Sequence, residues 1–215
     1  MRATGAPAAR ATSAAPSAGG PRPVRAATTA RPVALPDPPL VDHEAGVALR
    51  PWAPTPGDVA ALVAAWTDPV LVAANGVPDD VSAAAAARWI RGDAHRRAAG
   101  TNLDLAIGRA DGAATVLGEA GLRNIDPQRR RAEVSWWVAA EHRGRGLAVA
   151  AARLLVDWAL SAPGGLDQVW ARIDPANVPS ARVAAAAGLV ELGPAGDTVV
   201  WARTRTAPPS GSPTP

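Results

Sequence analysis

The feature that most constrains this chain is the segment of residues 133–188, which combines a strand pattern, a glycine-rich turn and a helix pattern. Residues 133–138 alternate as in a half-buried strand, Gly144 and Gly146 follow, and apolar residues then recur at helical spacing over residues 145–161. A strand that turns sharply into a helix leaves main-chain N–H groups unpaired at the helix start, beside the positive end of the helix dipole. The segment therefore predicts an α/β fold with a phosphate-binding turn.

The residue types of this turn exclude two other phosphate-binding patterns. The dinucleotide fingerprint G-x-G-x-x-G would require a glycine where the chain has Val149, and the P-loop requires a lysine, which the chain lacks. Arg143 and Arg145 stand beside the glycines and can donate charge-assisted hydrogen bonds to phosphate oxygens. The position of the turn between a strand and an amphipathic helix favours a pyrophosphate site over a solvated loop.

The remaining patterns extend this fold. They predict a strand at 47–52, a helix from Pro56 to Asp68, a helix from Ser82 to Ala99, strands at 102–109, 115–125 and 130–138, a strand at 168–173, a helix at 179–187, and a hairpin of 189–192 with 198–201. Pro163, Gly164 and Gly165 are expected to end the long helix. The expected fold class is α/β, with an α+β mixed sheet. Its three layers place helices on both faces of a mostly antiparallel sheet.

One domain is expected at residues 47–203. Residues 1–40, rich in Ala, Pro and Arg, and residues 206–215 have no apolar repeat that could bury a face. Such segments cannot offset the entropy lost on ordering, so both are expected to be disordered tails.

Composition narrows the possible functions. The chain has no cysteine, and His43, His95 and His142 show no metal-ligand spacing, so no metal is expected. Residues 1–40 contain five arginines and one aspartate, and the net charge is +3, so the remainder of the chain is close to neutral. A nucleic-acid partner is therefore not expected, although the basic tail leaves a weak anionic contact open. The chain has no apolar run of membrane-spanning length and no signal h-region, so a cytoplasmic location is expected.

Residues 133–192 resemble the GNAT acetyltransferase family, and within it the branch of ribosomal-protein N-terminal acetyltransferases. The resemblance lies in residues 133–138, in Glu141-His-Arg-Gly-Arg-Gly-Leu-Ala148, and in Asn177-Val-Pro-Ser180 followed by Ala187-Gly188-Leu189. It implies that acetyl-CoA lies between splayed strands ending near Val138 and Ile173. The residues it implies for cofactor binding are Trp137, Val138, Arg143, Gly144, Arg145, Gly146, Leu147, Ala148 and Asn177.

Three side chains are candidates for the chemistry of acetyl transfer. A carboxylate can remove the amine proton, and Glu133 is the first candidate, with Glu119 second. Ser180 could protonate the leaving thiolate, or alternatively cap the following helix. Glu133 could instead be a surface charge near Arg130 and Arg131.

The sequence thus predicts an N-acetyltransferase that acts by direct attack in a ternary complex. Its acceptor would be a primary amine of a protein N-terminus or of a small molecule such as an amino acid, a polyamine-like compound or an amino sugar. The alternative is a GNAT-fold module that binds acyl-CoA as a sensor without turnover. A monomer or a homodimer is expected.

Overall fold

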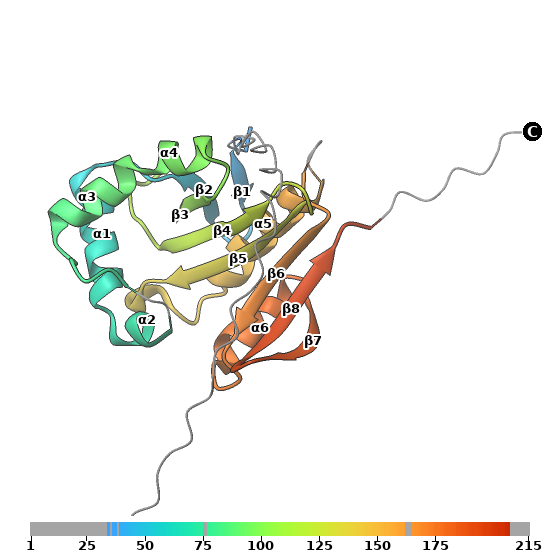
Figure 1. The fold of residues 1–215 in the computed structure, drawn as a ribbon. Coiled ribbons are helices and arrows are strands. Elements are labelled where there is room, and N and C mark those ends of the chain that lie inside the picture. Colours follow the sequence, from blue (N-terminus) through green and yellow to red (C-terminus); the bar gives the residue numbers. More distant parts are fainter. Residues whose placement is uncertain (1–33, 35, 38, 75–76, 162–164, 207–215) are drawn as a thin grey trace, which may run out of the picture.

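A twisted sheet runs through the computed structural model, which describes residues 34, 36–37, 39–74, 77–161 and 165–206. Its eight strands lie in the order β1-β2-β3-β4-β5-β6-β8-β7 (Figure 1). They are β1 (Leu40–Asp42), β2 (Val47–Pro51), β3 (Leu103–Arg109), β4 (Gly118–Asp126), β5 (Arg131–Val138), β6 (Gln168–Ile173), β7 (Val190–Ala195) and β8 (Thr198–Thr204). All neighbouring strands are antiparallel except β5 and β6, which are parallel.

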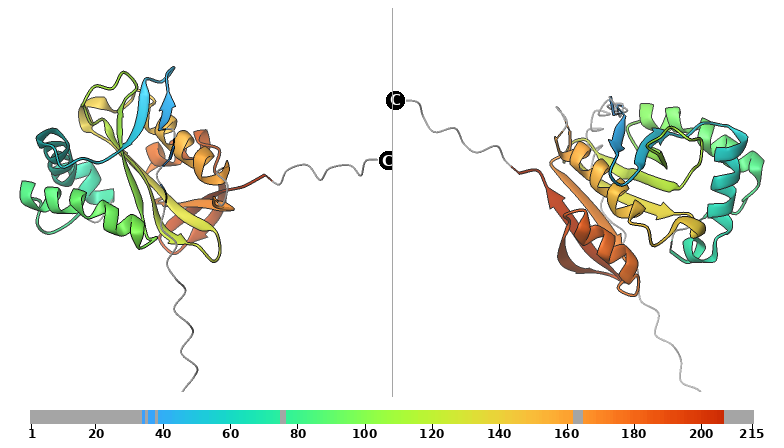
Figure 2. Two further views of the ribbon diagram at one scale, coloured as in Figure 1. Left: turned by 90° about the horizontal axis from the view of Figure 1, so that it is seen from above. Right: turned by 180° about the vertical axis from the view of Figure 1, so that it is seen from behind.

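Helices cover both faces of this sheet (Figure 2). One face carries the four helices between β2 and β3, and the other carries the two that follow β5 and β6. The helices are α1 (Pro56–Thr67), α2 (Pro69–Ala74), α3 (Ala83–Arg91), α4 (Asp93–Ala98), α5 (Leu147–Ser161) and α6 (Val178–Ala186), and a 3-10 turn, η1, spans Ala140–His142. The expected three-layer α/β fold is therefore confirmed.

The two faces have separate hydrophobic cores. The larger core lies under α5, where Leu155 and Val156 pack against strand residues such as Leu105 and Val169. The smaller core lies under α1 and α3 and contains Leu62 among its buried residues. Helical spacing explains the packing of α5, because residues three and four apart lie on one face of a helix.

The start of α1 is fixed by local interactions and by a tie to the sheet. The Thr55 hydroxyl accepts a hydrogen bond from the Asp58 N–H at 3.2 Å, and Pro56 occupies the first turn, where a missing N–H costs nothing. Arg50 of β2 donates to both Asp58 carboxylate oxygens at 2.7 Å. These contacts hold α1 over the sheet.

The parallel pair β5 and β6 separates along its length. Only Arg131, Ala132 and Glu133 pair with β6, opposite Gln168, Val169 and Trp170. The two strands then diverge, as Figure 1 shows. The splay predicted between strands ending near Val138 and Ile173 is present.

The structure corrects several local predictions. The helix expected from Ser82 to Ala99 is two helices, α3 and α4, which meet at Gly92, a residue that weakens a helix interior. β1 and α2 were not expected, because three and six residues are too few for a readable period. Leu40, assigned to the N-terminal tail, begins β1.

Some predictions fall beyond what the structure describes. Most of the predicted tails, together with Pro163 and Gly164, lie outside the described residues. Among the helices that are described, none is long and apolar enough to cross a membrane.

Candidate active site

The glycine-rich turn presents unpaired main-chain N–H groups at the start of α5. The first main-chain bond of this helix runs from the Ala150 N–H to the Gly146 carbonyl at 3.1 Å. The N–H groups of Leu147, Ala148 and Val149 precede it and have no main-chain partner in the described part of the chain. Such a helix start binds anions through these donors and the helix dipole.

Glycine is required at two positions of the turn. Gly144 and Gly146 both have φ of +76°, a conformation that costs a residue with a side chain roughly 1–2 kcal/mol. A β-carbon at either position would meet no atom within 4 Å. The space beside this backbone is therefore open, and a pyrophosphate can approach the N–H groups closely.

The two arginines of the turn have different surroundings. The Arg143 guanidinium donates from Nε to the Val138 carbonyl oxygen at 3.0 Å and from Nη2 to the Asp68 carboxylate. We therefore interpret Arg143 as an anchor of the turn, and its expected contact with phosphate stays a prediction. Arg145 is exposed and donates to the Glu141 carbonyl at 3.0 Å, so its guanidinium lies at the turn surface.

Asn177 and Ser180 lie at the start of α6. The Asn177 side-chain oxygen accepts a hydrogen bond from the Ser180 N–H at 3.1 Å, which makes Asn177 the N-cap. The expected alternative role of Ser180 as a helix cap is therefore wrong, because Ser180 lies inside the first turn. The Ser180 hydroxyl remains available for other contacts, and its residue is partly buried.

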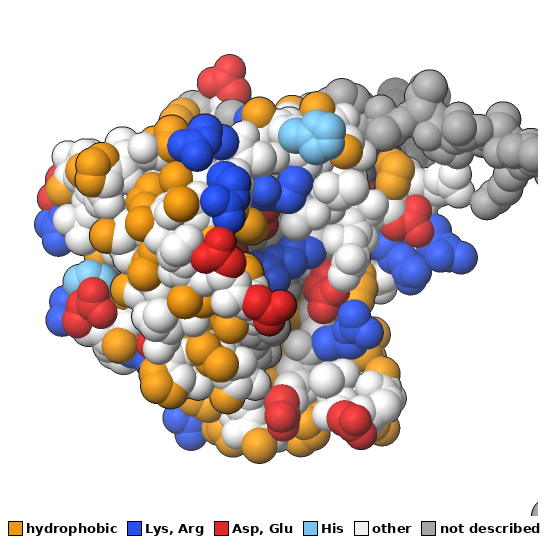
Figure 3. Space-filling model, turned by 60° about the vertical axis from the view of Figure 1, so that its left-hand side comes forward, with side chains coloured by type: hydrophobic (Ala, Val, Ile, Leu, Met, Phe, Trp, Pro, Cys, Tyr) orange, Lys and Arg blue, Asp and Glu red, His pale blue; other side chains and the backbone are white. Residues whose placement is uncertain are grey.

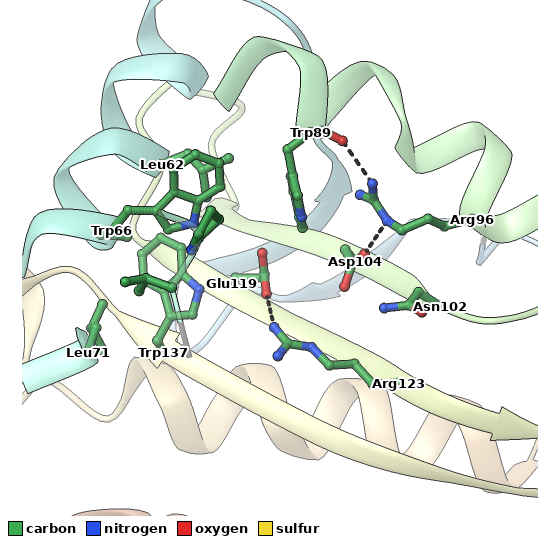
Figure 4. Close-up of a pocket in the computed structure, with 13 residues that line it drawn as sticks. Leu62, Trp66, Leu71, Trp89, Arg96, Asn102, Asp104, Glu119, Arg123 and Trp137 are labelled. Carbon is green, nitrogen blue, oxygen red and sulfur yellow. Dashed lines mark hydrogen bonds and ion pairs between the residues drawn. The ribbon is translucent and has the colours of Figure 1, made fainter. Parts of the chain in front are cut away.

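A cavity of about 250 Å³ opens on the face covered by α1 to α4. Figure 3 shows charged side chains of both signs around a hollow on this side of the molecule. Its walls are apolar toward α1 and α2 and polar toward α4 (Figure 4). The lining residues include Trp66, Leu71, Trp89, Asp104, Glu119 and Trp137.

Two buried carboxylates line this cavity. Glu119 of β4 is 2% exposed and accepts from Arg123 Nη2 at 3.1 Å, and Asp104 of β3 is 1% exposed and accepts from Arg96 Nε at 3.1 Å. Burial, and next the charge of Asp104, raise the pKa of Glu119 to about 7 despite Arg123. Burial likewise raises the pKa of Asp104. A carboxylate with a pKa near 7 is suited to accept a proton at neutral pH.

Glu133 lies on the same face of the sheet but outside the cavity lining. It is opposite Arg123 in the β4–β5 register, whereas Glu119 is opposite Trp137. Four strand residues separate the two positions, or about 13 Å. Glu133 accepts from Asn124 Nδ2 at 2.7 Å and forms an ion pair with Arg172 at 3.6 Å, and not with Arg130 or Arg131.

The two adjacent tryptophans of β5 point to opposite faces, as expected for a strand. Trp136 packs against the α5 core, whereas the Trp137 side chain lines the cavity. The main chain of Trp137 belongs to β5, beside the point where β5 and β6 diverge. Val138, the last residue of β5, is buried against the α5 core.

Asp104 and Arg96 were not predicted from the sequence. Asp104 stands between the alternating residues Leu103, Leu105 and Ile107, yet it lies on a strand whose first six residues are all buried. A buried charge requires a partner, but an alternating pattern in the sequence is typical of a strand with one exposed face, so the sequence held no signal for the burial of Asp104. Its partner Arg96 comes from α4, which the sequence merged into a longer helix. No group of three potential metal ligands occurs in the described ranges.

Comparison with known proteins assigns this chain to a family. Residues 47–190 match the family model described as the acetyltransferase (GNAT) domain. The chain therefore belongs to the GNAT acetyltransferase family, as the sequence motifs predicted.

Individual relatives agree with this assignment. RimJ of Mycobacterium smegmatis, solved in complex with CoA-disulfide, is 25% identical with a TM-score of 0.64 over 74% of this chain and 83% of that one. RimL, a ribosomal L7/L12 alpha-N-protein acetyltransferase solved with coenzyme A, shares the fold at 16% identity, with a TM-score of 0.63 over 74% of this chain and 94% of that one. The uncharacterized N-acetyltransferase p20 of Bacillus licheniformis is 31% identical over 68 residues, which span 32% of this chain and 38% of that protein.

Proposed function

We propose that this protein transfers an acetyl group from acetyl-CoA to a primary amine bound in the cavity beside Glu119. One observation carries the proposal: β5 joins the two parts of the site. Its end leads into the turn with the unpaired N–H groups, and its Trp137 lies opposite Glu119 and lines the cavity.

The turn and the splay fit acetyl-CoA. The N–H groups of Leu147, Ala148 and Val149, with Gly144 and Gly146, would hold the pyrophosphate, and exposed Arg145 would add charge. Trp137 and Val138 would bind acetyl-CoA through the end of β5, and Asn177 would contact the pantetheine arm of the cofactor.

Side chains of this protein would accept and donate the protons of the transfer. The amine nitrogen bonds to the acyl carbon, the carbon–sulfur bond breaks, and the proton lost by nitrogen passes to Glu119. The thiolate takes a proton from Ser180, which is replenished from solvent. We place Glu119 before Glu133 as the base, because Glu119 lines the cavity and has the raised pKa. A cytoplasmic location stays a prediction.

Thiol release measured with acetyl-CoA and a panel of primary amines tests the proposal. Glu119→Gln is expected to lower kcat by about 10²–10⁴-fold, the usual range for losing a general base. Acetyl-CoA affinity should be unchanged. Glu133→Gln is the matched control and is expected to lose less activity.

The results of these assays would distinguish an acetyltransferase from an acyl-CoA sensor. Acetyl-CoA binding without release of thiol for any amine would favour the sensor function instead. Equal losses from Glu119→Gln and Glu133→Gln would remove the basis for choosing Glu119.

A further inference from the structure

We infer that the acceptor is a small primary amine that carries a flat apolar group, such as an arylalkylamine. The inference rests on the proposed function and goes further by naming the acceptor class. It follows from the tryptophans and the charged side chains of the cavity wall.

Tryptophan is concentrated at this cavity. Three of the chain's eight tryptophans, Trp66, Trp89 and Trp137, line it, and each is partly buried. Trp52 packs behind two of them, with ring centroids 6.1 Å from Trp89 in an edge-to-face arrangement and 6.3 Å from Trp137. This packing fixes the two rings in place, so the wall is a preformed apolar surface.

The tryptophans come from separate parts of the chain. Trp66 is on α1, Trp89 on α3 and Trp137 on β5. Figure 4 shows Trp66 and Trp137 on one side of Glu119, with Arg96, Asn102 and Arg123 on the other. An amine nitrogen beside Glu119 would therefore direct an attached apolar group toward the tryptophan side.

The charges of the cavity suit an acceptor with a single amine. Asp104 and Glu119 are matched by Arg96 and Arg123, each pair at 3.1 Å, so the two acidic and two basic side chains balance. A polyamine would bring further ammonium groups to the apolar side, where the lining residues Leu62, Ala65 and Leu71 cannot compensate them. An amino sugar would similarly leave several hydroxyls without partners there.

The size of the cavity sets a limit on the acceptor. About 250 Å³ is below the range of roughly 300–1,000 Å³ that is usual for drug-sized ligands. One ring system with a short alkylamine arm fits such a space. The Arg96 guanidinium lies 4.3 Å from the centroid of the Trp89 ring and so occupies that ring. The rings of Trp66 and Trp137 are less occupied by protein charges and are therefore the ones left to contact an acceptor.

The test compares kcat/KM for 2-phenylethylamine, tryptamine, butylamine, spermidine, glucosamine and a peptide with a free N-terminal alanine, at saturating acetyl-CoA. We expect the two aryl amines to exceed each of the others by at least tenfold. Trp66→Leu should raise KM for 2-phenylethylamine about tenfold and leave KM for acetyl-CoA unchanged. Trp158→Leu, on α5 at the opposite face of the sheet, is the matched control and should change neither.

A tenfold preference for spermidine, glucosamine or the peptide would overturn the acceptor class while leaving the acetyltransferase function intact. If no amine is acetylated, the proposed function fails. Calorimetry with 2-phenylethylamine in the presence of CoA then decides the inference separately. Binding that Trp66→Leu weakens would support the inferred class, and no binding would refute it.

Discussion

Arg143 of the glycine turn forms an ion pair with Asp68, 75 residues away at the junction of α1 and α2. Asp68 also accepts a hydrogen bond from the Val70 N–H at 2.8 Å, which ties its carboxylate to the first turn of α2. The next residue of α2, Leu71, lines the cavity. The ion pair therefore joins the proposed cofactor turn to the wall of the proposed acceptor site.

Breaking this ion pair should affect both substrates. Asp68→Asn is expected to cost about 1–3 kcal/mol of unfolding free energy, because it leaves a partly buried guanidinium with a weaker partner. It should also raise KM for acetyl-CoA and for the amine together. Denaturant unfolding and steady-state kinetics measure these effects.

A surface pair provides the control. Arg109 and Asp111 are 53% and 55% exposed, and Asp111→Asn should cost at most about 1 kcal/mol, without a kinetic effect. An Asp68→Asn variant with wild-type KM values for both substrates would contradict the proposed connection.

Asn177 should contribute to both stability and cofactor binding. Asn177→Ala removes the cap of α6 and is expected to cost about 1 kcal/mol. It should also raise KM for acetyl-CoA. Ser82→Ala removes the equivalent cap of α3, where the Ser82 hydroxyl accepts from the Ala85 N–H at 3.2 Å. It should cost a similar amount with unchanged KM, because α3 does not carry the glycine turn. Equal KM values for the two variants would limit Asn177 to a structural role.

The rate of acetyl transfer should depend on pH through Glu119. A general base must be deprotonated to act, and the pKa of Glu119 is raised to about 7, chiefly by burial. The value of kcat/KM should therefore rise with pH through about 7 and level off above it. Glu119→Gln should remove this inflection. An inflection that persists in this variant would assign the base to another group.

The same shift predicts how stability depends on pH. Because the folded-state pKa of about 7 exceeds the ordinary value of 4.5, the folded protein binds the proton more tightly than the unfolded chain does. The stabilisation is complete below about pH 4.5 and is lost as the pH rises through 7. Its size is roughly 3 kcal/mol at most. Glu119→Gln should flatten the difference in unfolding free energy between pH 5 and pH 8, and a slope equal to wild type would contradict the shift.

The sequence predicted the second half of the fold well because its signals are local. Residues 168–173 form a strand with the expected bounds, and the helix expected from residue 145 begins at Leu147. Alternation, helical spacing and glycine with positive φ depend on neighbouring residues alone.

The acceptor side was harder to predict because it depends on tertiary contacts. Glu119 ranked second as the base, since its burial and its proximity to Asp104 arise only when β3 and β4 pair. The ion pair of Arg143 with Asp68 likewise joins distant segments, so no local pattern predicts it. The alanine-rich run favoured one continuous helix in the sequence, whereas the structure has two helices, α3 and α4, which separate at Gly92.

Calorimetric titration of the full chain with acetyl-CoA tests the central claim, that the open backbone of the glycine turn binds the pyrophosphate. Wild type should bind, and Gly146→Val should lose binding because the new side chain enters the open space beside the N–H groups. Gly112→Val is the control, since Gly112 also has a positive φ, +80°, with no atom near a β-carbon, but lies after β3 away from the turn. It should be destabilised yet still bind. No heat from wild type at millimolar acetyl-CoA, or unchanged affinity in Gly146→Val, would contradict the account.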